Sequence, residues 1–188
     1  MEELMLHVLD IAMNSVAAGA RCVKISISEQ PVVDRLTLCV ADNGRGMSAE
    51  LVEQVTAGYA TTKQKAKGWV GYGLALLSGT CDLVGGELRL LSRLGQGTLV
   101  TAVCPASHWD LPPLGPVAES LQPLLIGCTG VDLCFTHRWG THGYRLDTRT
   151  VRRVVGAEAY GTRSVQSWMM DQVRQGEDGL AAEKRGLL

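Results

Sequence analysis

Two short segments near the start of the chain alternate apolar and polar side chains residue by residue. Segment 23–28 carries Val, Ile and Ile at every second position, and segment 36–40 repeats the pattern with Leu, Leu and Val. A period of two is typical of strands with one buried face, so we expect these segments to pair across the connection 29–35. Residues 87–92 and 98–104 predict two further strands joined by a glycine-containing loop.

The segments before and between these strands have the apolar spacing of helices. Residues 4–18 have apolar side chains three or four positions apart and stop at Gly19, a natural helix end. A short helix is predicted over 48–55, with Ser48 as its cap, and an apolar helix over 74–84. Residues 57–70 show neither period and predict a mobile loop.

Prolines after residue 104 mark a change of region, and we place a boundary near Ala106. This predicts a domain over 1–106 and a C-terminal α/β extension over 107–188. Expected elements of the extension are a helix over 116–126, a hairpin of 131–139 with 144–146, and helices over 148–155 and 164–175. The last dozen residues are polar and are expected to fray.

Charge, hydropathy and cysteine content indicate which partners and which cellular location to expect. The 188 residues carry 18 basic and 19 acidic side chains, so the net charge of -1 gives no basis for nucleic acid or an anionic membrane as main partner. The acidic amino terminus and the lack of any run of 18 apolar residues predict a cytoplasmic protein. The six cysteines form no CxxC pair and are expected to be reduced. In the extension, Cys128, Cys134, His137 and His142 match no standard zinc spacing.

A glycine-rich turn at a helix start points to phosphate chemistry. Gly71 and Gly73 precede the predicted helix at Leu74, where free N–H groups and the helix dipole attract anions. The chain contains no GxxxxGK[ST] motif, and this turn lacks the third glycine of a dinucleotide fingerprint. Taken alone, the turn is equally consistent with an ordinary helix start.

Three polar side chains add evidence for a ligand site. Asp10 and Asn14 lie one turn apart on the first predicted helix and share a face. The amide oxygen of Asn14 is a suitable Mg²⁺ ligand, and the carboxylate of Asp10 can orient or deprotonate a water. The alternative is that both residues belong to a solvated polar stripe.

Asp42 ends a strand before two glycines, where its carboxylate can accept a hydrogen bond from an exocyclic amine. The alternative is a type I′ hairpin turn, but the residues that follow have a helical pattern.

Together these pieces resemble the histidine-kinase-like ATPase superfamily, which includes gyrase, MutL, sensor histidine kinases and anti-sigma-factor kinases. The order and spacing of its motifs match across residues 1 to about 105. The matching motifs are the N box (His7 to Ser15), the G1 box (Asp42 to Met47), the F box (Tyr59 to Lys63), the G2 box (Gly71 to Leu76) and the closing Gly97-Thr98. The extension resembles that of a bacterial group of stand-alone ATP-binding proteins of unassigned role.

The resemblance implies a Bergerat-type two-layer α/β sandwich, in which a mixed, largely antiparallel sheet is covered on one face by helices that hold ATP and Mg²⁺. Asn14 would bind Mg²⁺, Asp42 would read the adenine amino group, and Asp10 would be the catalytic base. The other implied nucleotide-binding residues are Gly44, Gly46, Met47, Thr62, Lys63, Gly71, Gly73, Leu74 and Thr98.

Departures from the pattern leave the activity open. Gyrase-like members carry Glu where this chain has Asp10, and we expect His7 to lie on the helix surface rather than to accept phosphate.

The leading hypothesis is a Mg·ATP-binding regulatory protein that phosphorylates a separate partner protein or hydrolyses ATP slowly. The alternative is a non-catalytic switch in which ATP controls a partner surface. An excess of arginines between Arg138 and Arg163 is expected to be solvent-exposed, or else to face an acidic partner.

Overall fold

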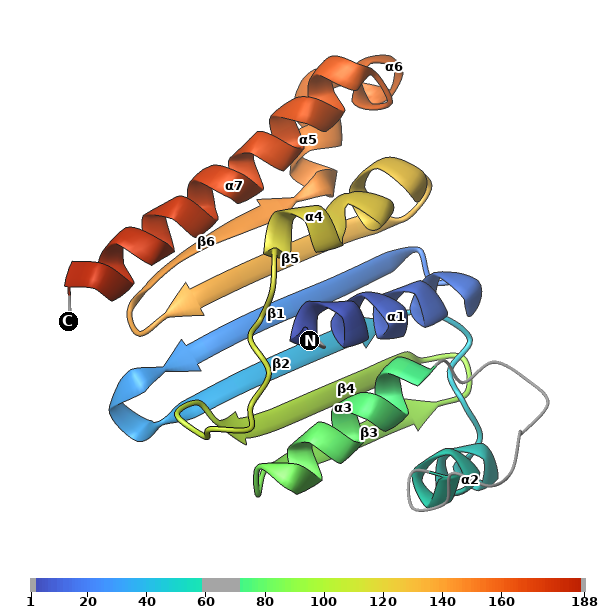
Figure 1. The fold of residues 1–188 in the computed structure, drawn as a ribbon. Coiled ribbons are helices and arrows are strands. Elements are labelled where there is room, and N and C mark those ends of the chain that lie inside the picture. Colours follow the sequence, from blue (N-terminus) through green and yellow to red (C-terminus); the bar gives the residue numbers. More distant parts are fainter. Residues whose placement is uncertain (1–2, 59–71, 187–188) are drawn as a thin grey trace.

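The chain folds around one six-stranded sheet in a computed structural model that describes residues 3–58 and 72–186 (Figure 1). The strands are β1 (Cys22–Gln30), β2 (Arg35–Asp42), β3 (Glu87–Arg93), β4 (Gly97–Pro105), β5 (Asp132–Trp139) and β6 (His142–Asp147). The helices are α1 (Leu4–Ala17), α2 (Ala49–Gly58), α3 (Tyr72–Leu83), α4 (Val117–Gln122), α5 (Thr148–Val155), α6 (Ala157–Tyr160) and α7 (Arg163–Gly186).

The strand order β3-β4-β2-β1-β5-β6 joins the two predicted regions in one sheet. β1 pairs antiparallel with β2, as expected, and β2 and β3 both pair antiparallel with β4. β1 also pairs parallel with β5, with Cys22 opposite Asp132 and Glu29 opposite Trp139. The hairpin of β5 and β6 therefore continues the sheet started by the N-terminal strands.

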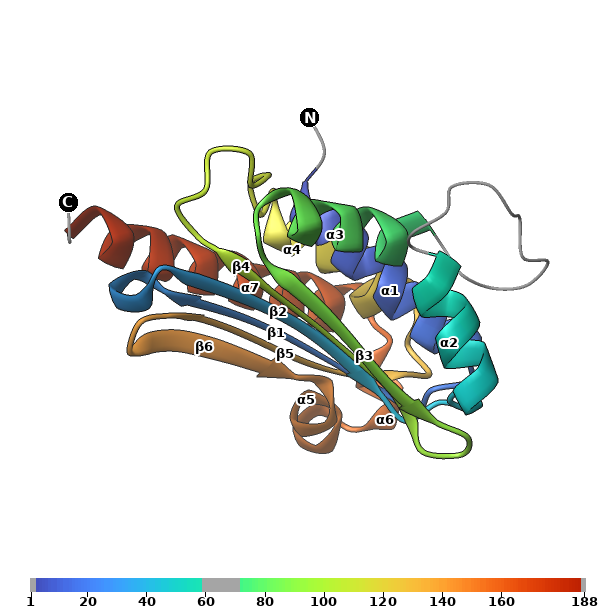
Figure 2. The same ribbon diagram turned by 90° about the horizontal axis from the view of Figure 1, so that it is seen from below.

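Helices cover one face of this sheet, as the predicted sandwich requires. Figure 2 shows α1, α3 and α4 together on that face and the short α5 on the opposite side near β6. In Figure 1, α1 lies between α4 and α3. The covered face carries the alternating apolar residues of the central strands, including Ile25, Ile27, Leu38 and Val40, all buried. The strand period that predicted these elements thus also sets which face holds the core.

One predicted feature of the extension is wrong. Residues 177–186, which belong to the last dozen, form the end of a helix instead of fraying, since α7 continues to Gly186. Leu180 of this helix is buried, and Lys184 donates to Glu29 of β1 at 2.6 Å. Glu177 and Lys184 of this segment have partners on the sheet, so its polarity does not mark a solvated tail.

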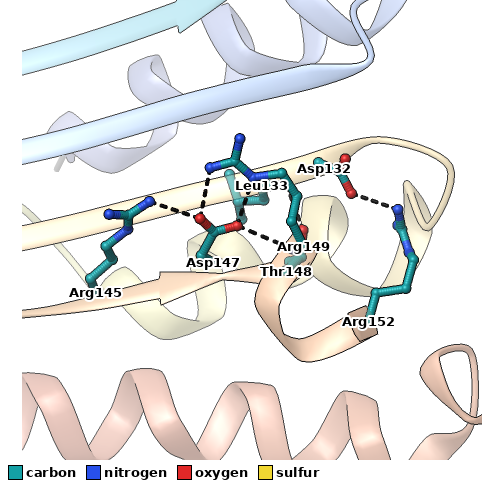
Figure 3. A network of polar contacts seen from close by, with 7 residues as sticks. All are labelled: Asp132, Leu133, Arg145, Asp147, Thr148, Arg149 and Arg152. Carbon is teal, nitrogen blue, oxygen red and sulfur yellow. Dashed lines mark hydrogen bonds and ion pairs between the residues drawn. The ribbon is translucent and has the colours of Figure 1, made fainter. Parts of the chain in front are cut away.

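The arginines of the extension are exposed at the surface, except for the half-buried Arg152, and three of them hold α5 in place (Figure 3). Arg145 and Arg149 both donate to the carboxylate of Asp147, which also caps α5 through the backbone N–H of Arg149. These hydrogen bonds, first among them the one from Arg149, hold the pKa of Asp147 well below its ordinary value. Arg152 donates to Asp132 at the start of β5.

Candidate functional site

A pocket lies where α1, α2 and the start of α3 cover the ends of β2, β3 and β4. Most of its wall is apolar, and a few polar groups converge on it, which is typical of small-molecule sites. The lining residues are Ile11, Asn14, Ser15, Ala18, Val40, Asp42, Arg45, Met47, Leu51, Val55, Leu74, Leu90, Thr98 and Val100.

The carboxylate of Asp42 is the best-defined polar group in this pocket. Its Oδ1 accepts from the backbone N–H of Gly44 at 2.7 Å and of Thr98 at 3.3 Å. Its Oδ2 accepts from the hydroxyl of Ser15 at 2.7 Å. A carboxylate offers about four acceptor positions, so these three donors fix its orientation and leave about one position for a ligand donor.

Two glycines let the backbone close around this carboxylate. Gly46 has φ +65°, and a Cβ there would lie 1.9 Å from the carbonyl oxygen of Arg93. Gly97 has φ +93°, and its Cβ would lie 2.0 Å from the carbonyl oxygen of Asp42. Both positions therefore need glycine for conformation and for space. They bring the G1 box against the turn between β3 and β4, where Met47 N–H donates to Ser92 Oγ at 2.9 Å.

On α1, Asn14 faces the pocket while Asp10, one turn earlier, faces α3. The side-chain amide of Asn14 makes no hydrogen bond to residues 3–58 or 72–186, and its oxygen is chemically suited to a hard cation such as Mg²⁺. Asp10 Oδ2 accepts from the backbone N–H of Gly73 at 2.7 Å. Asp10 and Asn14, which were predicted to share one face of this helix, therefore have two different environments.

These features can be compared with known proteins. A family model described as "Histidine kinase-, DNA gyrase B-, and HSP90-like ATPase" matches residues 1–108, more than half of the chain. The chain belongs to this ATPase family. The match includes every residue of the pocket and supports ATP as its ligand.

Curated relatives of the ATPase domain are sensor kinases. Sporulation kinase D of Bacillus subtilis is 28% identical over 100 residues, covering 53% of this chain and 19% of that protein. Histidine protein kinase DivJ of Caulobacter vibrioides is 33% identical over 101 residues, covering 52% of this chain and 17% of that protein. The chain thus spans about a fifth of the length of these relatives.

A solved structure supports the fold. The MutL ATPase domain of Aquifex aeolicus, complexed with ADP, superposes with a TM-score of 0.51 at 17% sequence identity. The match covers 79% of this chain and 66% of that chain. The mixed sheet with helices on one face is therefore the fold of this ATPase family, as the sequence motifs predicted.

Among the residues predicted to bind nucleotide, the ATPase pocket brings together Asn14, Asp42, Met47, Leu74 and Thr98. Gly44 and Gly46 shape the Asp42 turn, and Gly73 donates to Asp10. Thr62, Lys63 and Gly71, with most of the predicted loop 57–70, lie outside the described residues. The roles of all these residues in binding ATP stay predictions.

His7 does not lie on the helix surface, so that prediction is wrong. Its side chain is 4% exposed because α1 has neighbours on two sides, α3 and α4. Its Nε2 has no hydrogen-bond partner among the described residues. Burial leaves His7 without the solvent access that a phosphoacceptor requires.

Sequence reasoning missed Ser15, whose hydroxyl holds Asp42. Ser15 occupies a core-facing position in the apolar period of α1 and is buried. A serine at an apolar position of a helix was the available signal, because a buried hydroxyl needs a hydrogen-bond partner.

The extension contains a second buried polar group, His137 on β5, which is 1% exposed. Its Nδ1 lies 2.6 Å from Glu177 of α7, and its Nε2 lies 2.8 Å from Glu29 of β1. Burial alone would lower the pKa of His137, but the hydrogen bonds to Glu177 and Glu29 outweigh it and raise this pKa above 6.5. Both ring nitrogens face carboxylates and can both donate only when the ring is protonated, so this arrangement favours the imidazolium form.

The four residues considered as a zinc site are not brought together as one. Cys134 and His137 are three residues apart on one strand, so their side chains point to opposite faces of the sheet. Among residues 3–58 and 72–186, no group of three or more His, Cys, Asp or Glu side chains is arranged to hold a metal ion. Within the same residues, no helix combines the length and apolar composition needed to cross a membrane.

Proposed function

We propose that the chain is a cytoplasmic bacterial Mg·ATP-binding regulatory protein that transfers the terminal phosphoryl group of ATP to a partner protein or, slowly, to water. The observation that carries this proposal is the Asp42 carboxylate, held by three donors with an acceptor position left for the adenine amino group. The amide of Asn14, which lines the same pocket and has no hydrogen-bond partner among the described residues, would hold Mg²⁺. Bound Mg²⁺ would neutralise phosphate charge.

One observation favours a second candidate, a non-catalytic switch that binds ATP without consuming it. Asp10 Oδ2 accepts from Gly73 N–H, so this oxygen is directed at α3, and Asp10 does not line the pocket in which a nucleophile would meet ATP. Incubation with labelled ATP and Mg²⁺, alone and with extract of the native cell, separates the two candidates. Released phosphate or a labelled partner supports the enzyme, and intact bound ATP supports the switch.

Asn14→Ala tests the metal ligand. Because an alanine methyl cannot coordinate Mg²⁺, we expect the ratio of ATP affinities with and without Mg²⁺ to fall close to one. Calorimetric titrations of the parent and the variant, with Mg²⁺ or with excess chelator, measure this ratio. An unchanged ratio would place the metal on other residues.

Ser15→Ala tests the support of Asp42. The variant removes a donor from Oδ2, and a hydrogen bond contributes about 1 kcal/mol, so ATP affinity should fall roughly 3- to 10-fold. Ser164→Ala, at an exposed position of α7, is the control and should leave affinity unchanged. Equal affinities for ATP in the Ser15 variant and the parent would show that Asp42 needs no such support.

A further inference from the structure

Helices α1 and α3 come unusually close at Gly73, in the first turn of α3. A Cβ placed on Gly73 would lie 2.6 Å from Asp10 Oδ2, 2.7 Å from Asp10 Cβ and 3.0 Å from the carbonyl oxygen of His7. A side chain larger than hydrogen has no room there. The backbone of this turn is therefore held against α1, and the N–H of Gly73 points at α1.

The group that receives this N–H is the carboxylate of Asp10, at 2.7 Å. N–H groups in the first turn of a helix have no partner within the helix, and the helix dipole is positive at this end. A carboxylate satisfies both the unpaired donor and the dipole. Asp10 thus acts as a cap for α3 that is supplied by a different helix, 63 residues away in the chain.

The residues next to this contact form two walls of the ATPase pocket. Asn14 follows Asp10 by one turn of α1, and Leu74 follows Gly73 in α3; both line the pocket, whereas Asp10 does not. The Asp10–Gly73 hydrogen bond therefore fixes the distance between the side that holds Asn14 and the turn expected to hold the phosphates. Phosphoryl transfer depends mainly on such positioning, because the protein supplies little covalent chemistry.

We propose that Asp10 is a positioning residue and not the general base: it holds the first turn of α3 in place relative to Asn14. This inference rests on the proposed ATP-binding function of the same pocket. In this role the negative charge of Asp10 stabilises the N-terminus of α3. The shorter side chain of aspartate is sufficient for this contact, whereas a general base would need the longer reach of a glutamate.

Two substitutions of Asp10 separate positioning from base catalysis. Asp10→Asn keeps an oxygen that can accept from Gly73 N–H but cannot take up a proton, whereas Asp10→Ala removes the acceptor. Positioning predicts that the Asn variant keeps ATP affinity and turnover within about 3-fold of the parent, while the Ala variant binds ATP about 10-fold more weakly. Base catalysis predicts a loss of roughly 10²–10⁴-fold in turnover for both variants, with ATP affinity unchanged.

Amide hydrogen exchange at Gly73, measured by NMR without nucleotide, tests the contact itself. We expect slow exchange in the parent and in Asp10→Asn, and exchange at least about 10-fold faster in Asp10→Ala. The amide of Gly86 is the control, because it donates to Cys81 at the other end of α3 and should be unaffected if the helix stays folded.

The two measurements fail in distinguishable ways. A parent chain that binds no ATP would overturn the proposed function, and the exchange at Gly73 would still decide whether Asp10 holds α3. Equal exchange at Gly73 in the parent and the Ala variant would overturn the positioning role. An Asn variant with normal ATP affinity but turnover lowered a hundred-fold would overturn it as well and restore Asp10 as the base.

Discussion

Asp42→Asn is expected to lower the affinity for ATP about 10- to 100-fold without unfolding the protein. The Asn oxygen can keep the hydrogen bonds from Gly44 and Thr98, but the NH₂ group replaces the oxygen that faces Ser15 and the ligand. An amine cannot donate to this NH₂, and a charge-assisted hydrogen bond is worth about 1.5–3 kcal/mol. Calorimetric titration with ATP, together with the circular dichroism spectrum, measures both parts of the prediction.

Asp34→Asn is the matched control for this variant. Asp34 also accepts two hydrogen bonds, from the backbone and the side chain of Ser107, but it lies outside the pocket. Its substitution should leave ATP affinity unchanged. GTP should bind the parent poorly, because guanine presents a carbonyl where adenine presents an amine. Equal ATP affinity in Asp42→Asn and the parent would mean that the base is bound elsewhere.

His137→Gln is expected to give the largest loss of stability, about 3–5 kcal/mol. The imidazolium lies between the carboxylates of Glu29 and Glu177. Its removal leaves Glu29 with the ammonium of Lys184 and Glu177 with the hydroxyl of Tyr144, in a largely buried site. Urea denaturation at pH 6 measures the change. His142→Gln is the matched control: this histidine is exposed on the neighbouring strand, 3.8 Å from Glu183, and its loss should cost less than about 1 kcal/mol.

The same site predicts how stability depends on pH. The pKa of His137 is raised above 6.5 in the folded state, so its contribution is complete below about pH 6.5 and is lost as the pH rises through the folded value. The pKa of Glu29 is lowered, since hydrogen bonds from His137 and Lys184 outweigh its burial, and burial raises the pKa of Tyr144.

Urea denaturation of the parent from pH 6 to pH 9 should therefore show a falling free energy of unfolding. The difference between the parent and His137→Gln should shrink over the same range. A difference that stays constant or grows with pH would contradict the assigned charge of His137.

The sequence predicted most of what depends on local order. The alternation of apolar and polar residues predicted the strands β1 and β2. Ser48 caps α2 as predicted, because its hydroxyl oxygen accepts from Leu51 N–H at 3.3 Å. The spacing of Asp42 and its glycines predicted a carboxylate at the end of a strand, and in the structure this carboxylate lines the pocket. These features depend on residues close together in the chain.

Contacts between distant residues could not be predicted in this way. The parallel pairing of β1 with β5 joins residues about 110 positions apart, and no local pattern specifies it. Glu177 and Lys184 were interpreted as parts of a polar tail because their partners, His137 and Glu29, lie far away in sequence. The contact of Asp10 with Gly73 could not be predicted either, because the residue spacing within α1 does not show how α3 packs against it.

The most direct test is a crystal structure of the chain with Mg²⁺ and a non-hydrolysable ATP analogue. We expect the adenine amino group within hydrogen-bond distance of the Asp42 carboxylate, the metal ion on Asn14, and the phosphates at the start of α3. An empty pocket at saturating analogue, or a nucleotide bound away from Asp42, would contradict the proposed ATP site.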